Sequence, residues 1–328
     1  MKNVTILILK GCNLSSFETP RRAFITVNEH LLQEEKKEIF NVVVAGISDP
    51  VELENGLYTI HPDRLIGDVK DPGLIIIPAL SGDISKCVQD NKDVIPWLIK
   101  HYHSGAEIAS LCIGAFLLAT TGLLDGKLCS THWQAKEQFK NLFPLVNLMT
   151  EKIMTDENGI YTSGGSFSSA NLVLYLIEKY AGRESSVYCS KIFQVDMGRH
   201  SQSPFVIFKG QKEHADEYVM KAQEFIEENY SERISIDRLA SHVLLSRRSF
   251  ERRFKKATSN SALEYMQRVK IEAAKKRLET SMENVNEVMY DVGYNDPKAF
   301  RDIFRKITGL SPGQYRNRYH RNLEKHQL

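Results

Sequence analysis

Short apolar runs alternate with amphipathic stretches along the first half of the chain. Four runs rich in Val, Ile and Leu are typical of buried parallel strands: residues 4–9, 41–45, 74–78 and 108–112. Three stretches have apolar residues at helical spacing and predict covering helices: residues 20–35, with Pro20 at the first helical position, 94–104, and 168–180, which ends at Gly182. This alternation predicts an α/β domain with a doubly wound, flavodoxin-like parallel sheet.

The pattern loses its periodicity from about residue 183 to residue 212 and is purely helical beyond it. Seven helices are predicted there: residues 216–230, 236–243, 247–257, 262–278, 285–292, 297–307 and 312–319. Four of them follow a serine suited to cap a helix: Ser235, Ser246, Ser261, with Glu264 completing a capping box, and Ser311. We therefore expect an α/β domain at residues 1–185, a linker at 186–214, an all-α domain at 215–322 and a tail at 323–328.

One element occurs twice in the helical segment, at a constant offset of 50 residues. The offset aligns these pairs: Phe250 with Phe300, Phe254 with Phe304, Lys255 with Arg305, Lys256 with Lys306, and Thr258 with Thr308. In each copy the two Phe residues stand four apart, so both face one side of a helix. A shorter helix precedes each copy, and Gly293 suits a left-handed turn in the second. This layout predicts two helix-turn-helix units, each able to enter a major groove of DNA.

The net charge of +2 hides a division along the chain. Residues 246–328 hold 19 Lys and Arg against 10 Asp and Glu, a net +9, whereas residues 1–245 hold 24 against 31, a net −7. A basic segment behind an acidic body favours an anionic partner, and double-stranded DNA is the first candidate. Seven residues beside the Phe pairs are candidate DNA contacts: Arg247, Arg248, Glu251 and Arg252 in the first copy, and Lys298, Arg301 and Asp302 in the second.

These C-terminal motifs resemble the AraC family of bacterial regulators over about residues 215–320. The first copy matches at Ala240, Leu245, Ser246, Phe250, Arg252, Phe254 and Lys255, and the second at Gly293-Tyr294, Phe300, Phe304-Arg305-Lys306, Thr308-Gly309, Ser311-Pro312 and Tyr315-Arg316. The resemblance implies that Arg248, Glu251 and Arg252 face the groove. In the second copy the corresponding residues are Pro297, Lys298, Arg301 and Asp302. Asp302 departs from the arginine common in the family. A carboxylate cannot donate a hydrogen bond to guanine, so the first helix-turn-helix unit is the stronger candidate for base reading.

Cys112 lies between an apolar run and the small residues Gly114-Ala115. This is the position of a nucleophile elbow, where a thiol projects from a sharp turn, and His132 is a candidate base. A Cys-dependent hydrolase or glyoxalase-type enzyme is therefore one interpretation. In the other, Cys112 is a small buried hydrophobe and His132 a structural side chain.

The first 185 residues resemble the ThiJ/PfpI-like, class I glutamine amidotransferase-like domain at the front of the GlxA-type branch of AraC regulators. The shared motifs are Cys112, Gly114-Ala115, Gly122-Leu123-Leu124-Asp125-Gly126, Thr131-His132-Trp133 and Thr162-Ser163-Gly164-Gly165. The resemblance implies an acid beside the cysteine in active relatives. Ser16 occupies that position here, Glu18 falls on the other side of the turn, and Asn171 stands where this branch often has Asp. We therefore expect Cys112, His132 and Ser16 to line an effector pocket without catalysis. A purely structural or dimerising domain, or a redox switch at Cys112, remains an alternative.

These observations predict a sequence-specific DNA-binding transcriptional regulator. Its expected partners are promoter DNA, an unknown small-molecule effector, RNA polymerase and a second copy of the chain. The five cysteines are scattered and show no metal-ligand spacing, so we expect neither a metal nor a cofactor. No apolar run approaches the roughly 18 residues of a membrane span and no signal peptide is visible, which favours a cytoplasmic protein without a membrane partner.

Overall fold

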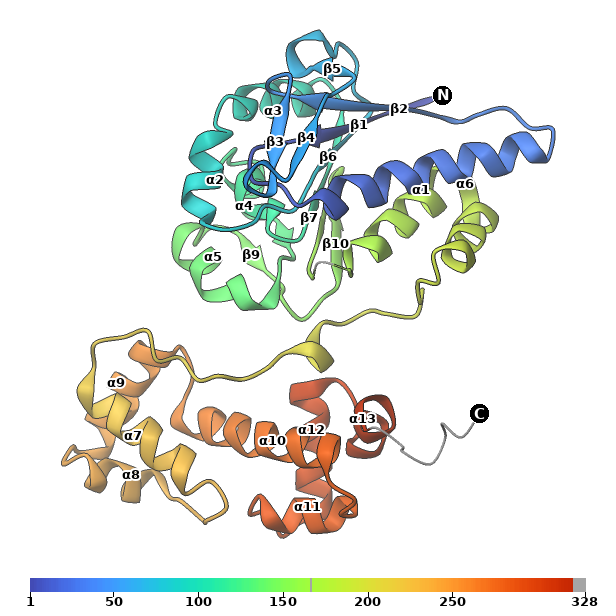
Figure 1. The fold of residues 1–328 in the computed structure, drawn as a ribbon. Coiled ribbons are helices and arrows are strands. Elements are labelled where there is room, and N and C mark those ends of the chain that lie inside the picture. The colour runs from blue at the N-terminus through green and yellow to red at the C-terminus, as the bar shows by residue number, and fades with distance from the viewer. Residues whose placement is uncertain (166, 321–328) are drawn as a thin grey trace. The chain divides into compact units, whose positions relative to one another are not determined.

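A seven-stranded sheet organises the first of two compact units in the computed structural model, which describes residues 1–165 and 167–320 (Figure 1). The strands, in spatial order, are β10 (Met154–Glu157), β11 (Ile160–Ser163), β7 (Glu107–Leu111), β6 (Leu74–Ile77), β1 (Lys2–Ile8), β2 (Phe40–Gly46) and β5 (Arg64–Leu65). All neighbours pair in parallel except β10 and β11. The four predicted strands and the parallel sheet are therefore confirmed. Because β1, β6, β7 and β11 are parallel, the loops that follow them meet at one edge of the sheet.

Helices cover both faces of this sheet (Figure 1). They are α1 (Leu14–Gln33), α2 (Ile84–Asp90), α3 (Val94–His103), α4 (Gly114–Ala119), α5 (Lys136–Leu142) and α6 (Ser169–Ile192). Helices α1 and α6 pack on each other, whereas α4 packs on β6 and β7. Two strand pairs lie outside the main sheet: β3 (Val51–Leu53) with β4 (Tyr58–Ile60), and β8 (Leu128–Cys129) with β9 (Asn147–Leu148). Short 3-10 turns occupy Glu54–Gly56, Ile66–Asp68 and Trp133–Ala135.

The prediction that Pro20 begins the first helix is wrong. Helix α1 begins at Leu14, because the Asn13 side chain accepts a hydrogen bond from the Ser15 backbone N–H and caps the helix there. Pro20 lies inside the helix, where the lack of an N–H removes one backbone hydrogen bond. The helix tolerates this loss because its inner face, with Phe17 and Phe24, is buried in the core.

The first unit extends to Gln202, beyond the boundary expected at residue 185. Gly182 interrupts α6 with φ 84° and ψ 166°, and the backbone then resumes a helical course to Ile192. Ser186 and Cys189 of this continuation are buried and belong with the first unit. Residues 186–202, which the sequence analysis assigned to a linker, are therefore ordered parts of the α/β unit.

The second unit begins at Ser203 with a 3-10 turn, Ser203–Phe205, and is otherwise all-α. Its helices are α7 (Glu217–Glu228), α8 (Ile236–His242), α9 (Arg247–Thr258), α10 (Ala262–Thr280), α11 (Val285–Asp291), α12 (Pro297–Thr308) and α13 (Pro312–Tyr319). All seven predicted helices are confirmed, as are the four serine caps and the Ser261–Glu264 capping box. The expected tail at 323–328 lies outside the described residues.

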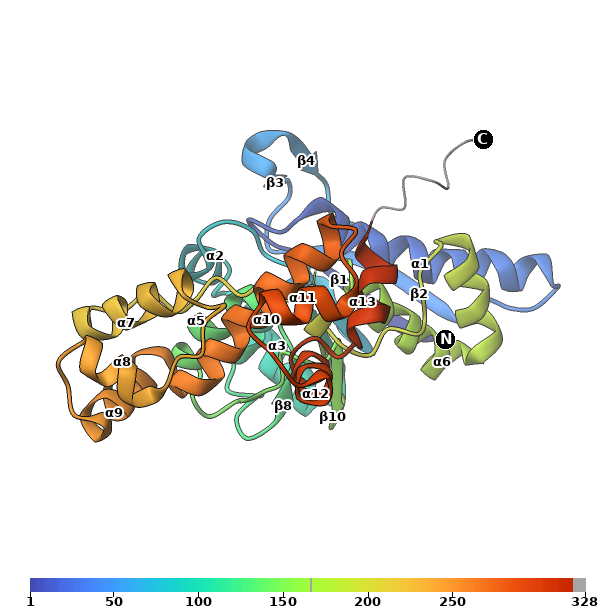
Figure 2. The same cartoon turned by 90° about the horizontal axis from the view of Figure 1, so that it is seen from below.

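Two small cores share the long helix α10. Tyr265 and Met266 from its first half pack with α7, α8 and α9, and Ile271 and Leu278 from its second half pack with α11, α12 and α13. Figure 2 shows α10 running between these two groups of helices. No helix of the described part of the chain is long and apolar enough to cross a membrane.

Candidate functional site

The two copies of the repeat have nearly the same internal geometry. The rings of Phe254 and Tyr265 lie 5.4 Å apart between centroids at an interplanar angle of 81°, and those of Phe304 and Tyr315 lie 5.5 Å apart at 80°. The Tyr265 hydroxyl donates to Glu227 over 2.6 Å, and the Tyr315 hydroxyl donates to Glu279 over 2.6 Å. The offset of 50 residues therefore extends to tyrosines that the sequence analysis did not pair.

The ends of α9 and α12 also match. The hydroxyls of Thr258 and Thr308 each donate over 2.8 Å to the carbonyl oxygen four residues earlier. The next residues, Ser259 and Gly309, both have left-handed backbone conformations, with φ of 58° and 74°. Each copy is thus a helix-turn-helix unit, and the second helices of the two units end in the same way.

The turn before each second helix has the same backbone shape but a different residue. Gly293 has φ 77°, and Leu244, which lies 49 rather than 50 residues earlier because the first turn is one residue shorter, has φ 55°. The Leu245 N–H donates to the Ala240 carbonyl over 2.9 Å, as the Tyr294 N–H does to Met289 over 3.0 Å. Leu244 is 90% exposed, so its side chain contributes little to the core of this unit.

The candidate DNA-contacting side chains lie on the exposed faces of α9 and α12. In α9 these are Arg247, Arg248, Glu251 and Arg252, and in α12 they are Lys298, Arg301 and Asp302. Arg247 lies 3.3 Å from the Asp237 carboxylate and 3.5 Å from Glu251, which orients it along the helix pair. All seven residues are exposed, and Arg248, Arg252, Lys298 and Asp302 lie opposite the buried Phe pairs, so each second helix presents charge to solvent.

Arg253 has a different role from its neighbours on α9. Its guanidinium donates two hydrogen bonds, of 2.9 and 3.0 Å, to the Asp216 carboxylate at the start of α7. The hydrogen bond from Arg253 lowers the pKa of Asp216. Arg253 therefore fastens α9 to α7.

Cys112 occupies a sharp turn between β7 and α4. Its backbone has φ 52°, and only 3% of the residue is exposed. The turn passes close to the neighbouring strand, because a Cβ at Gly114 would lie 2.5 Å from the Pro78 carbonyl oxygen. The Thr131 hydroxyl donates to the Cys112 carbonyl over 2.8 Å, which ties the loop carrying His132 to this turn.

A backbone hydrogen bond and burial set the tautomer and the charge of His132. Its Nδ1 accepts a hydrogen bond of 3.2 Å from the Gln134 backbone N–H, so the neutral ring carries its proton on Nε2. Burial of the half-buried ring lowers the pKa of His132, which favours this neutral form. The lone pair that a base would use is therefore already engaged.

Ser16, and not a carboxylate, occupies the position at which an acid is expected in active relatives. The Ser16 hydroxyl donates to the Asn13 carbonyl over 2.7 Å and lies 3.3 Å from the Ala79 carbonyl at the end of β6. The Glu18 carboxylate is held by Arg21, with contacts of 2.5 and 2.8 Å. Asn171 is buried and donates to the Asp196 carbonyl over 2.7 Å. Ser16 thus contacts the end of β6, and Thr131 ties the loop carrying His132 to the Cys112 turn after β7, whereas a shared pocket of the three side chains stays a prediction.

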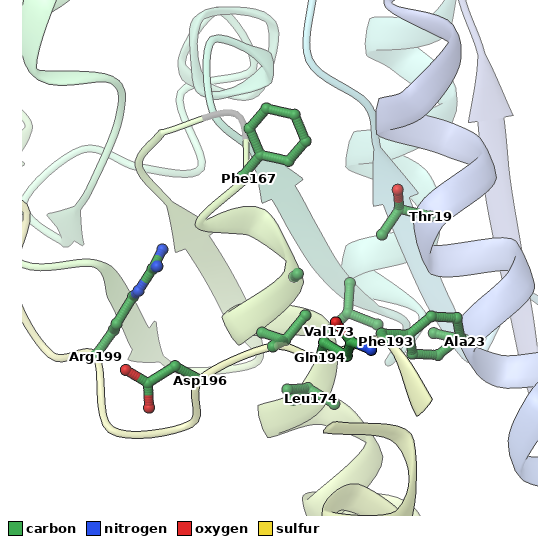
Figure 3. A pocket seen from close by; sticks show the side chains of 11 residues that line it. Thr19, Ala23, Phe167, Val173, Leu174, Phe193, Gln194, Asp196 and Arg199 are labelled. Atoms are coloured by element: carbon green, nitrogen blue, oxygen red, sulfur yellow. The ribbon is translucent and has the colours of Figure 1, made fainter. Parts of the chain in front are cut away.

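A hollow of about 370 Å³ lies elsewhere in the same unit, between α1, α6 and the segment that follows α6. Ala23, Leu174 and Phe193 give it an apolar wall, and Figure 3 shows Asp196 and Arg199 beside each other away from that wall. Neither this hollow nor an adjoining one of about 340 Å³ is lined by Cys112, His132 or Ser16. Residues 193–199 have no periodic pattern, so this region could not be predicted from the sequence.

Comparisons with known proteins agree with the α/β fold and the two helix-turn-helix units described above. The chain belongs to the DJ-1/PfpI family, whose model matches residues 2–179. Residues 239–318 match the model of a helix-turn-helix domain. Both resemblances identified from the sequence are thereby confirmed, and the chain combines a DJ-1/PfpI domain with an AraC-type helix-turn-helix domain.

Similar individual proteins are named as transcriptional regulators. The HTH-type transcriptional regulator GbdR of Pseudomonas aeruginosa is 29% identical over 228 residues, which cover 67% of this chain and 60% of that protein. The HTH-type transcriptional regulator GlxA of Rhizobium meliloti is 26% identical over 219 residues, which cover 65% and 66%. A crystal structure of a proposed transcriptional regulator from Vibrio parahaemolyticus has a TM-score of 0.53 at 21% identity and covers 58% of this chain and 98% of that one, which shows the fold alone.

Proposed function

We propose that this protein is a sequence-specific DNA-binding transcriptional regulator. The observation that carries the proposal is the duplicated helix-turn-helix, in which α9 and α12 expose charged faces opposite their buried Phe pairs. The net charge of +9 over residues 246–328 would neutralise several phosphates and give affinity, and base contacts from α9 would give sequence preference.

One protomer would read two sites on one side of the duplex. Helix α10 joins the two helix-turn-helix units and has 19 residues, which corresponds to a length of about 28 Å. Successive turns of the major groove lie about 34 Å apart, so both second helices can reach it. The two half-sites would differ in sequence, because Arg248 and Arg252 of α9 have Lys298 and Asp302 as their counterparts in α12.

The DJ-1/PfpI domain would act as a sensor and dimerisation domain. A small-molecule effector and a second copy of the chain are its proposed partners, and RNA polymerase would respond to the DNA-bound form in the cytoplasm. We do not favour catalysis at Cys112, because His132 has its Nδ1 lone pair engaged and Ser16 replaces the acid. The sharp turn at Cys112 is the observation that favours an enzyme as the second candidate.

Replacing Arg248 or Arg252 by Ala tests the proposal in the full chain. Fluorescence anisotropy would compare the DNA upstream of the gene with random DNA of equal length. A lost base contact should cost about 1–3 kcal/mol on the specific DNA and much less on random DNA. Lys221→Ala, which removes one exposed positive charge from α7, is the matched control. A folded wild-type chain that prefers neither DNA would contradict the proposal, and equal losses on both would assign these arginines to phosphates.

A further inference from the structure

Gln202, the last residue of the first unit, holds its amide inside a ring of oxygen atoms. The residue is 2% exposed. Its amide nitrogen lies 2.9 Å from the carbonyl oxygens of Thr150 and Lys152, 3.1 Å from that of Thr131 and 3.2 Å from the Ser130 hydroxyl. We call these four oxygens the oxygen cage. The cage adjoins the Cys112 turn, because Thr131 also donates its hydroxyl to the Cys112 carbonyl.

The amide fits the oxygen cage poorly. An amide nitrogen carries two hydrogens, whereas the cage offers four acceptors. The Ser130 hydroxyl directs its own hydrogen to the Lys152 carbonyl over 2.7 Å, so it too meets the amide as an acceptor. The other end of the amide, Oε1, is buried and has no hydrogen-bond partner among the described residues. A positively charged group with three N–H donors would satisfy the cage better than the amide does.

The amide of Gln202 fills the space beside Gly164 in the wall of the cage. A Cβ at Gly164 would lie 1.9 Å from the Gln202 amide nitrogen, so the amide rests against a position where any side chain would collide with it. The walls also have contacts that do not involve the Gln202 side chain. Ser130 N–H donates to the Thr162 hydroxyl over 2.6 Å, and the Ser130 hydroxyl holds Lys152.

The chain directly after Gln202 is fastened to the DNA-binding unit. Lys275 of α10 is only 4% exposed in its side chain and donates to the Val206 carbonyl over 2.6 Å. The Glu272 carboxylate on the same helix accepts from the Phe208 N–H over 3.1 Å. Three residues, Ser203–Phe205, separate the buried amide from these anchors along the chain. Expulsion of the amide removes the side-chain contacts that hold this end of the connector and leaves the hydrogen bonds of the Gln202 N–H and the Ser201 hydroxyl to the Glu151 carbonyl, of 2.9 Å each. The other end of the connector is held by α10.

We propose that the oxygen cage binds the primary ammonium group of a small molecule and that Gln202 is its resident competitor. Ligand binding expels the amide and weakens the attachment of the connector to the first unit, which then depends on the bonds of Ser201 and the Gln202 N–H to Glu151. The regulatory consequence rests on the function proposed above, because the connector leads to the helix that joins the two helix-turn-helix units. Binding itself can be tested without DNA, so a failure of either proposal is recognised separately.

The first test uses Gln202→Ala in the full chain, with methylammonium chloride as the probe. Trp97 and Trp133 both lie in the first unit, so thermal unfolding followed by Trp fluorescence reports on this unit. We expect a saturable rise in Tm with methylammonium, and an apparent affinity roughly tenfold higher than in wild type because no occupant competes. Gln202→Met, which refills the space without donors, should not respond.

Control salts show whether the cage selects cations that carry N–H donors. Equal concentrations of NaCl and of tetramethylammonium chloride, whose cation has no N–H, should leave the Tm of Gln202→Ala unchanged. If KCl raises the Tm as much as methylammonium does, the cage is a site for a monovalent metal ion and the proposal is overturned. A folded Gln202→Ala that shows no selective response to methylammonium overturns it as well.

A second test does not depend on the folding of Gln202→Ala. In wild type, methylammonium should increase the rate of chymotrypsin cleavage after Phe205, in the connector, at least severalfold over NaCl. Gly164→Ala should increase the same cleavage without any ammonium, because the new methyl group occupies the seat of the amide. Unchanged cleavage after Phe205 in both experiments would overturn the proposal.

Discussion

Gly293→Ala should unfold the second helix-turn-helix unit more easily while leaving the α/β unit intact. Gly293 has φ 77°, a left-handed conformation that costs a residue with a Cβ about 1–2 kcal/mol. A Cβ at this position would also lie 2.2 Å from the Ser231 carbonyl oxygen and 2.5 Å from the Lys270 ammonium. Both neighbours must move to admit the methyl group.

The displaced ammonium adds a second contribution to the cost. Lys270 donates to the carbonyls of Val292 and Glu232 over 3.0 and 3.2 Å, and burial lowers the pKa of this lysine. Hydrogen bonds to charged groups contribute about 1.5–3 kcal/mol. If one of them is lost together with the backbone term, the total is about 3–5 kcal/mol. That is a large part of the 5–15 kcal/mol typical of a whole domain.

Urea unfolding of the full chain measures this loss with an internal reference. Far-UV circular dichroism includes the seven helices of the second unit, whereas Trp97 and Trp133 report the first unit alone. With an m value of at most about 3 kcal/mol/M, Gly293→Ala should lower the helical midpoint by about 1 M or more and leave the fluorescence midpoint unchanged. Leu244→Ala, at the matching place in the first copy, is the control. Equal midpoints for the two variants would refute the reasoning.

Two other predictions concern the α/β unit. Burial opposes ionisation of Glu107, but hydrogen bonds from Lys2, Tyr161 and Tyr180 outweigh it and lower the pKa of Glu107 from 4.5 to about 2. The stabilisation by this carboxylate is therefore complete above pH 4.5 and lost as the pH falls through 2. Glu107→Gln should lower the fluorescence midpoint at pH 7 and converge with wild type near pH 2, and a constant gap would contradict this. Cys112→Ser should leave DNA affinity within about twofold, with no hydrolase or glyoxalase turnover in either form, whereas Cys112-dependent turnover would establish the enzyme alternative.

The helical unit could be predicted almost completely because its signals are local. Ser246 and Ser311 cap their helices through bonds to residues three positions ahead, and Phe250 and Phe300 repeat at helical spacing. These interactions depend only on neighbours in sequence. The positive φ at Leu244 could not be predicted in the same way, because the first copy has no glycine there. The hydrogen bond from the Leu245 N–H to the Ala240 carbonyl closes the turn around that conformation.

The start of α1 shows how a strong local signal can mislead. Proline is favoured at the first helical position, and the pattern therefore placed the start at Pro20. Asn13 is an equally good cap, and a start at Leu14 buries Phe17 as well as Phe24. Burial of an aromatic side chain contributes about 1.5–3 kcal/mol, which offsets much of the roughly 3 kcal/mol cost of proline inside a helix. The longer helix therefore forms, and it carries Ser16 to the carboxyl edge of the sheet.

The connector and the cage that holds Gln202 are the part of the chain that could not be predicted from the sequence. Gln202 is held by oxygens of residues 130–152, which are far from it in sequence and follow no period. Three of these four oxygens belong to backbone carbonyls, which every residue type has, so the sequence of residues 130–152 does not reveal the site. A segment held by a few polar contacts opens at a lower free energy than the apolar core beneath it. A ligand needs only to outcompete one amide to act on such a segment, whereas a ligand acting through the core would have to break the packing of the whole sheet.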